Sequence, residues 1–324
     1  MNQLKFSDLG LADPIQLALK TRNHDTPTPI QQEAIPELLK GSDVLGIAQT
    51  GTGKTGAFAL PILHKLSKNQ PKDKRREPRA LILAPTRELA IQIGEEIAAY
   101  GQNLQLRHTV IFGGVKQNPQ VNALRRGIDI IVATPGRLLD LMSQGFIDLN
   151  GCAFLVLDEA DRMLDMGFVH DVRKIVSALP NKRQSLLFSA TMPKEIARLS
   201  GDMLNNPVRI EVTPQATPIE SITQNIYHVG AADKTKLLSS IMDDPSLSKV
   251  IVFTRTKHRA NRVADKLGKS GVDAEAIHGN KSQGARQRAL SRFRAGEARV
   301  LVATDIAARG IDVDGVTHVI NFEL

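Results

Sequence analysis

The sequence predicts an α/β protein with two domains, each a mostly parallel sheet covered by helices on both faces. Two observations lead to this prediction. Short continuous apolar runs alternate with helix-period segments along most of the chain, which is typical of buried parallel strands joined by helices. The alternation then stops at a stretch rich in Pro and Thr, residues 213–219, and starts again after it, which indicates a linker between two domains.

The first domain is expected over residues 1–212. Its strands are predicted at the apolar runs that end in turn or helix signals, namely residues 44–47, 80–83, 108–112, 128–132, 154–157, 185–188 and 208–212. Between these runs lie helical segments such as residues 89–100, in which Leu89, Ile93 and Ile97 share one face. The second domain is expected over residues 220–324, with strands at residues 223–229, 250–253, 274–278, 300–304 and 318–322.

The composition favours a globular protein with a polyanionic partner. The 324 residues carry a formal net charge of +8, and the isoelectric point is about 9.6, which suits nucleic acid. Trp is absent and Tyr occurs twice, so phosphate and sugar contacts are expected to matter more than base stacking. The basic run at residues 72–79 is interpreted as a solvated loop, with contact to nucleic acid as the alternative.

Nothing in the sequence predicts a secreted or membrane protein. The chain contains one cysteine, Cys152, so no internal disulfide is expected, which is typical of a reducing compartment. The N-terminal residues lack the apolar run of a secretory signal, and no uncharged apolar run reaches the ~20 residues needed to span a bilayer. We therefore expect no membrane association and a cytoplasmic location.

Residues 48–55, AQTGTGKT, have the composition of a loop that cradles phosphate groups between a strand and a helix. Gly51 and Gly53 let backbone N–H groups converge on the phosphates without a Cβ in the way. Lys54 should reach the β- and γ-phosphates of a nucleoside triphosphate, and the Thr55 hydroxyl should bind Mg²⁺. The candidate ligand-binding residues of this loop are Thr50, Gly51, Thr52, Gly53, Lys54 and Thr55.

The same loop also matches the dinucleotide fingerprint GxGxxG, through Gly51, Gly53 and Gly56. That fingerprint needs an acidic residue about 20 positions further on, at the end of the second strand. The second expected strand runs instead into Ala84 and Pro85, so a nicotinamide or flavin site is not expected.

A second motif, VLDEAD at residues 156–161, has the character of a metal and water site. Four apolar residues run directly into Asp158 and Glu159, so both carboxylates should emerge at the C-terminal end of a strand, beside the phosphate loop. We expect Asp158 to hold Mg²⁺, directly or through water, and Glu159 to orient or deprotonate the attacking water. The two motifs together predict an enzyme that binds and hydrolyses a nucleoside triphosphate.

With these motifs the chain resembles the DEAD-box ATP-dependent RNA helicases, of the bacterial RhlE-like kind. The residues from Asp158 to Asp161 spell the motif that names the family, and further family motifs follow in order over nearly the whole chain. The resemblance implies two RecA-like domains that close over Mg·ATP and single-stranded RNA and locally unwind short RNA duplexes. The activity so implied is an RNA-dependent ATPase that reads RNA through its backbone, and we also expect a monomer.

The resemblance assigns further residues to the nucleotide. Gln31, in the segment PTPIQ, would read the adenine edge, and His24 occupies the position where the family often has a base-stacking aromatic residue. Phe6 matches an isolated upstream aromatic residue of the family, with ordinary core packing as the alternative. Gly310 and Asp312, in the segment ATDIAARGID, would face the nucleotide from the second domain.

The resemblance also implies a link between hydrolysis and RNA. In the family, the segment SAT, which spans Ser189 to Thr191 in this sequence, hydrogen-bonds the acidic motif and couples hydrolysis to unwinding, so Asp161 is the expected partner. Tight turns that carry a hydroxyl or a guanidinium group suit phosphate contacts. The residues that match RNA-contacting motifs of the family are Pro85, Thr86, Arg87, Gly114, Thr134, Arg137, Thr254, His278, Gly279 and Thr304.

One family motif does not occur in the sequence. It is HRxGRxGR, whose arginines stabilise the transition state, an effect worth ~10³–10⁵ in rate. We therefore expect a truncated second domain and reduced turnover. A nucleotide-gated RNA-binding clamp with little turnover is the alternative to a helicase, and a P-loop ATPase unrelated to nucleic acid is a third interpretation that the RNA-side motifs disfavour.

Overall fold

The computed structural model describes residues 4–69, 76–212, 222–305 and 313–323. The chain divides into two compact units, Met1–Thr217 and Pro218–Leu324. The residues predicted as a linker, 213–219, lie outside the described residues. Within the described ranges, no helix combines the length and the apolar character that crossing a bilayer requires.

The first unit alternates helices and strands from its N-terminus onward. Its elements are η1 (Phe6–Leu9), α1 (Asp13–Thr21), α2 (Pro29–Lys40), β1 (Val44–Ile47), α3 (Lys54–Lys68), β2 (Ala80–Leu83), α4 (Arg87–Tyr100), β3 (His108–Ile111), α5 (Asn118–Arg125), β4 (Ile130–Ala133), α6 (Pro135–Ser143), β5 (Phe154–Leu157), α7 (Ala160–Asp165), α8 (Val169–Ser177), β6 (Gln184–Ser189), α9 (Lys194–Met203) and β7 (Val208–Glu211). The strands form one sheet in the order β3-β4-β2-β5-β6-β1-β7, in which all neighbouring pairs are parallel.

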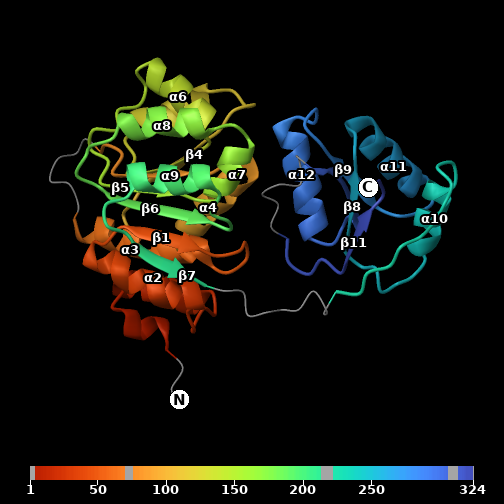
Figure 1. Ribbon diagram of the computed structural model, residues 1–324, viewed down its shortest axis with the longest axis horizontal. Coiled ribbons are helices and arrows are strands. Elements are labelled where there is room, and N and C mark those ends of the chain that lie inside the picture. Colours follow the sequence, from red (N-terminus) through yellow and green to blue (C-terminus); the bar gives the residue numbers. More distant parts are fainter. Residues whose placement is uncertain (1–3, 70–75, 213–221, 306–312, 324) are drawn as a thin grey trace. The chain divides into compact units, whose positions relative to one another are not determined.

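Helices cover both faces of this sheet, as Figure 1 shows. Ile82 of β2 belongs to one core, which α2, α3 and α4 complete, whereas Leu81 and Leu83 belong to the other, which α6, α8 and α9 complete. Successive side chains on a strand point to opposite faces, so a strand that is buried on both faces has apolar residues throughout. This two-sided burial is the physical cause of the continuous apolar runs in the sequence.

All seven strands of the first unit were predicted from the sequence, and most of their ends agree to within one residue. The largest difference is at β4, which begins at Ile130 rather than at residue 128. Ile128 is buried in the core, and burial rather than strand pairing accounts for its apolar side chain. Asp129 separates it from the strand and is engaged in side-chain hydrogen bonds at that end of the sheet.

The second unit contains a four-stranded sheet. Its elements are α10 (Lys234–Ile241), β8 (Val250–Thr254), α11 (Lys257–Lys269), β9 (Ala274–Ile277), α12 (Gln283–Arg294), β10 (Val300–Thr304) and β11 (His318–Asn321). The strand order is β11-β8-β10-β9, again with parallel pairs. Val300 and Val302 of β10 face a core completed by α10 and α11, and Leu301 faces a smaller core that includes Phe293 of α12.

One strand prediction in the second unit is wrong. Residues 223–229 form no strand, because no neighbouring strand of the described chain pairs with them. Their larger apolar side chains face solvent: Ile226 is 81% exposed and Tyr227 is 59% exposed. Apolar residues with β propensity form a strand only where a partner strand satisfies the backbone, which a pattern along one segment does not reveal.

Candidate active site

The phosphate loop connects β1 to α3, as the sequence predicted. Gly51 and Gly53 have positive φ angles of 80° and 90°, a backbone region that favours glycine. A Cβ at Gly53 would lie 2.7 Å from Nε2 of Gln31, so a larger residue at this position would displace the Gln31 side chain. The loop ends at Lys54, the first residue of α3, where free N–H groups of the helix favour an anion.

Lys54 is held by the loop itself. Its side chain is buried, and Nζ donates a hydrogen bond to the carbonyl oxygen of Ala48 at 2.9 Å. This contact keeps the ammonium group at the centre of the loop, where phosphate oxygens would be stronger, charge-assisted acceptors. Thr52 closes the turn by donating from Oγ1 to the Gln49 carbonyl oxygen at 2.7 Å, while Thr50 is exposed.

Asp158 and Glu159 follow β5 at the same edge of the sheet as the phosphate loop, because all strands run parallel. Only β6 separates β5 from β1, which places the two motifs about 10 Å apart across the sheet. Both carboxylate side chains are buried, Asp158 with 2% exposure and Glu159 with 4%. The predicted convergence of the two motifs at one edge is therefore present.

The pKa values of both carboxyl groups are raised. Burial is the main cause for Asp158, and the nearby Lys54 ammonium partly opposes it. Burial also raises the pKa of Glu159, with a further contribution from the Asp158 charge, while Arg162 opposes the shift through an ion pair at 3.0 Å. A divalent cation bound at this site would stabilise the ionised form of both buried carboxyl groups.

The donor set suits Mg²⁺. The described residues contain no group of three or more His, Cys, Asp or Glu side chains arranged to hold a metal ion. Mg²⁺ does not need such a group, because it is usually bound by one or two carboxylates together with water and substrate phosphates. Asp158, whose carboxylate is buried, and Thr55, the second residue of α3, would be the oxygen ligands in such an arrangement.

Gln31, which the resemblance assigns to adenine, is joined to the phosphate loop. Its Oε1 accepts a hydrogen bond from the backbone N–H of Thr28 at 2.9 Å, and its Nε2 donates to the Gly53 carbonyl oxygen at 3.0 Å. His24 lies on the exposed surface just before this segment. The ring of Phe6 is buried in the core, and its backbone N–H donates to the carbonyl oxygen of Asp25, the residue after His24.

A cluster around Tyr100 was not predicted from the sequence. The ring centroids of His24 and Tyr100 lie 6.3 Å apart, and the Arg22 guanidinium lies 4.9 Å from the centroid of the Tyr100 ring. Arg22 also pairs with Glu96 at 2.7 Å, and burial raises the pKa of Tyr100. A Cβ at Gly56 would lie within 4 Å of both the Tyr100 hydroxyl and the Gln31 amide, so Tyr100 reaches the same point of α3 as Gln31. The only sequence signal is that Tyr100 ends the buried face of α4.

Asp161 makes the contacts expected with the SAT segment. Its Oδ2 accepts hydrogen bonds from the backbone N–H and the Oγ1 of Thr191, both at 2.9 Å. Its own N–H donates to Oγ of Ser189 at 3.2 Å, and Ser189 in turn donates to the Thr191 carbonyl oxygen at 2.7 Å. The acidic motif after β5 and the SAT segment at the end of β6 are therefore connected by three hydrogen bonds.

The RNA-contact candidates of the first unit lie in or just after three turns, at the C-terminal ends of β2, β3 and β4. Thr86, which follows the buried Pro85, caps α4 by accepting a hydrogen bond from the Leu89 N–H, and Thr134 stands at the corresponding position before α6. Gly114 has a positive φ angle of 77°, which favours glycine, and the Arg87 guanidinium lies against it. Arg137 donates from Nη2 to the Val115 carbonyl oxygen at 3.3 Å. Both guanidinium groups therefore lie against the turn that follows β3.

The RNA-contact candidates of the second unit lie at one edge of its sheet. Thr254 and Thr304 are paired residues at the ends of β8 and β10, and His278 follows β9, the other neighbour of β10. Nε2 of His278 lies 3.0 Å from Oδ1 of Asn261, and burial lowers the pKa of His278, with the surrounding cationic side chains adding to the effect. Gly279 is exposed beside it. Gly310 and Asp312 lie outside the described residues.

Comparison with known families matches both units. The family described as DEAD/DEAH box helicase matches residues 28–199, and the helicase conserved C-terminal domain matches residues 233–324. Among curated relatives, the DEAD-box ATP-dependent RNA helicase CshA of Bacillus cereus is 42% identical over 319 residues, and the ATP-dependent RNA helicase DeaD of Escherichia coli is 40% identical over 320 residues. Each alignment covers 98% of this chain.

The chain spans 60% of the length of CshA and 50% of the length of DeaD. Among solved structures, Saccharomyces cerevisiae Dbp5 bound to RNA and ADP BeF3 matches with a TM-score of 0.85 and 32% identity, covering 99% of this chain and 81% of that one. A DEAD box protein from Methanococcus jannaschii matches with a TM-score of 0.61 and 36% identity, covering 99% and 85%. The narrower RhlE-like assignment stays a prediction.

Proposed function

Because the chain belongs to the family of DEAD-box ATP-dependent RNA helicases, we propose that it hydrolyses ATP in response to RNA and uses this cycle to separate short RNA duplexes locally. The observation that carries the proposal is the buried group formed by Lys54, Asp158 and Glu159 at one edge of the first sheet. The solved relative bound to RNA and ADP BeF3 supports the same ligands for this chain.

Each residue of the site has a separate role in hydrolysis. Lys54 leaves the Ala48 carbonyl oxygen and binds the phosphate oxygens, and the N–H groups at the start of α3 hold the same phosphates. Thr55 and Asp158 would hold Mg²⁺, which would neutralise phosphate charge when bound. Glu159 accepts a proton from water as the water oxygen attacks the γ-phosphorus, and the bond to ADP breaks.

The choice of ATP depends on Gln31 and His24. The Gln31 amide has a donor and an acceptor, which match the two hydrogen-bonding positions on the adenine edge. The exposed ring of His24 lies beside this segment and packs near the ring of Tyr100. Because the Gln31 amide also contacts Gly53, binding of the base acts on the phosphate loop directly.

RNA binds through its backbone at the C-terminal edges of the two sheets. In the first unit, Arg87 and Arg137 supply guanidinium groups at the turns, where they suit phosphate contacts. In the second unit, Thr254, His278 and Thr304 supply hydroxyl and imidazole groups at one edge. Asp161 links the hydrolytic residues to the SAT segment, so a change at the γ-phosphate is transmitted to residues beyond β6.

Steady-state hydrolysis of ATP with and without single-stranded RNA tests the proposal. The chain should hydrolyse ATP faster in the presence of RNA, and Lys54→Ala should abolish the activity, because the phosphates lose their cation. Lys68→Ala, at the exposed C-terminal end of the same helix, is the matched control and should leave the rate unchanged. Hydrolysis by the Lys54→Ala variant at the wild-type rate would refute the proposed site.

The nucleotide-gated clamp is distinguished by a second measurement on the same samples. A clamp would bind RNA more tightly with a non-hydrolysable ATP analogue but would show a very slow single turnover of ATP. A helicase would show the same gain in RNA affinity together with fast single-turnover hydrolysis and release of the strands of a short duplex.

A further inference from the structure

One segment at the edge of the first unit carries cationic residues and no acidic residue. No Asp or Glu occurs from residue 97 to residue 128, a stretch that includes the edge strand β3 and helix α5. The first carboxylate after it, Asp129, is fully buried. The exposed cationic side chains of this stretch are Arg107, Lys116, Arg125 and Arg126.

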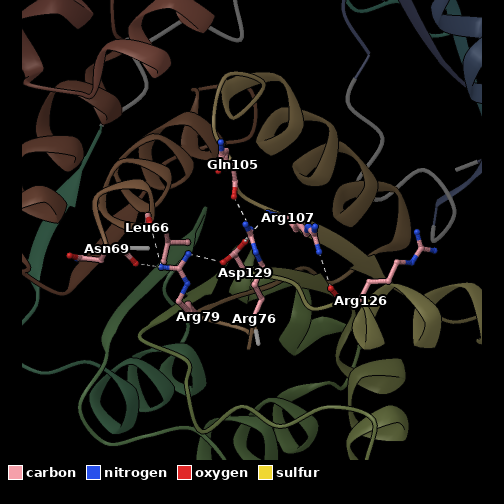
Figure 2. A network of polar contacts seen from close by, with 8 residues as sticks. All are labelled: Leu66, Asn69, Arg76, Arg79, Gln105, Arg107, Arg126 and Asp129. Atoms are coloured by element: carbon pink, nitrogen blue, oxygen red, sulfur yellow. Dashed lines mark hydrogen bonds and ion pairs between the residues drawn. The ribbon is translucent and has the colours of Figure 1, made fainter. Parts of the chain in front are cut away.

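Asp129 does not neutralise these exposed groups, because other arginines use its carboxylate (Figure 2). Arg76 donates from Nη1 to Oδ2, and Arg79 donates from Nη2 to Oδ1, both at 2.7 Å. Arg107 contributes only its backbone N–H, at 2.8 Å. Arg76 and Arg79 belong to the basic run at residues 72–79, and these two partly buried guanidinium groups are used by Asp129, while residues 72–75 of the run lie outside the described residues.

The exposed arginines are held in place without a carboxylate partner. Nη1 of Arg107 donates to the Arg126 carbonyl oxygen at 2.9 Å, and Figure 2 shows this contact beside the Asp129 network. The Arg125 guanidinium lies 5.8 Å from the ring centroid of Phe146. In the described chain, neither Arg107 nor Arg125 nor Arg126 forms an ion pair with Asp or Glu. Such ordered, unneutralised guanidinium groups suit a polyanion, because little further ordering is needed when it binds.

This cationic edge continues from the turn already placed among the RNA-contact candidates. The turn at Gly114 stands at one end of β3, and Arg107 stands directly before the other end. Lys116 is exposed just after the turn, and α5 then leads to Arg125. The strand of four residues and the helix of eight residues each span about 12–13 Å, a distance that a few nucleotides of extended RNA cover.

We propose that this edge, defined by Arg107, Lys116, Arg125 and Arg126, binds the phosphates of RNA that extends beyond the Gly114 turn. The proposal rests on the proposed function, because it needs RNA at that turn. RNA is favoured over an acidic protein partner because the edge is continuous with the turn against which Arg87 and Arg137 lie. The edge adds affinity for longer RNA without reading its sequence.

Binding of two oligouridines, one of about 8 and one of about 25 nucleotides, to the Arg125→Gln/Arg126→Gln double variant tests this inference. With the non-hydrolysable ATP analogue present, the variant should bind the longer RNA about 5- to 20-fold more weakly than the wild type, with a salt slope shallower by about 1.4. Affinity for the short RNA should not change, which also shows that the variant is folded. The matched control is Lys174→Gln/Arg198→Gln, which removes two exposed charges from α8 and α9.

Each other outcome overturns the inference in a distinguishable way. Equal affinities of variant and wild type for the longer RNA would refute the edge and leave the proposed function intact. An equal loss in the control variant would show a general effect of net charge, and equally tight binding of a polyglutamate peptide would show a surface for acidic proteins. No binding of the short RNA by the wild type would refute the proposed function as well.

Discussion

Glu159 combines an unusual backbone with the chemistry assigned to it. Its φ angle is 53°, in the left-handed region, which costs a residue with a Cβ about 1–2 kcal/mol. The other non-glycine residues with positive φ among those described, Asn23 and Asn206, are asparagines, which tolerate this region. The turn from β5 into α7 requires the conformation, and the ion pair with Arg162 then fixes the carboxylate. Strain of this kind is common where a side chain must be held in one position.

Glu159→Gln should separate binding of ATP from its hydrolysis. The amide keeps the size of the side chain but does not accept a proton, so kcat should fall by about 10²–10⁴. The dissociation constant for Mg·ATP should change by less than about threefold, because Asp158 remains to hold Mg²⁺. Stopped-flow measurements should also show slow release of ATP and RNA, and release as fast as in the wild type would contradict the role of Glu159.

Asp158→Asn should stabilise the chain at neutral pH when no nucleotide is present. The pKa of Asp158 is raised in the folded chain, so its ionisation opposes folding. This penalty is absent below the ordinary carboxyl pKa of about 4 and grows as the pH rises through the raised value. The melting temperature of the variant should therefore exceed that of the wild type by a few degrees at about pH 8, and by less at about pH 5.

Calorimetry of the two proteins at both pH values makes this measurement, with Asp202→Asn as the control for an exposed aspartate. The control should change the melting temperature by the same small amount at both pH values. A variant of Asp158 that is less stable than the wild type at about pH 8 would show that the buried carboxylate contributes favourably to folding, contrary to the account.

At the scale of elements, α4 connects the two candidate sites of the first unit. It begins at Arg87, beside the Gly114 turn, and ends at Tyr100, beside His24 and Arg22. Over its 14 residues the helix spans about 21 Å. The periodicity of residues 89–100 predicted the helix and its buried face, because both depend on the local order of side chains. The Tyr100 cluster also includes residues that follow α1, and the residue pattern within α4 alone does not reveal this contact.

Arg137→Ala should weaken RNA binding to a similar degree for every sequence. The guanidinium group lies against the Val115 carbonyl oxygen at the turn, where the proposed function has it contact phosphate rather than bases. The slope of log affinity against log salt should become shallower by about 0.7, as expected when one phosphate contact to a single strand is lost. Titration of two RNAs of different sequence at several salt concentrations measures both effects, with Arg198→Ala as the control.

A loss of affinity for only one of the two RNAs would assign Arg137 to base recognition instead. Weaker binding with an unchanged salt slope would show that Arg137 maintains the conformation of the turn, through its contact with Val115, and does not contact phosphate.

At the scale of the whole molecule, the sequence was informative where local pattern and chemistry coincide. Apolar strands that end in AQTGTGKT and VLDEAD predicted the parallel sheet of the first unit and the edge at which Lys54, Asp158 and Glu159 meet. The sequence was not informative where strand pairing or ion pairing depends on segments far apart in the chain. In the described chain, residues 223–229 have β propensity but no partner strand, and the ion pairs of Asp129 join residues from two separate loops.

The account depends most on one shared site for the phosphates and the metal. A double-mutant cycle on the dissociation constant of Mg·ATP tests it, using the wild type, Lys54→Ala, Asp158→Asn and the double variant. If one Mg·ATP joins the two side chains, the second substitution should cost far less in the variant that already carries the first, giving a coupling of about 1 kcal/mol or more. Losses that add to within about 0.5 kcal/mol would place the two residues in independent sites and contradict the account.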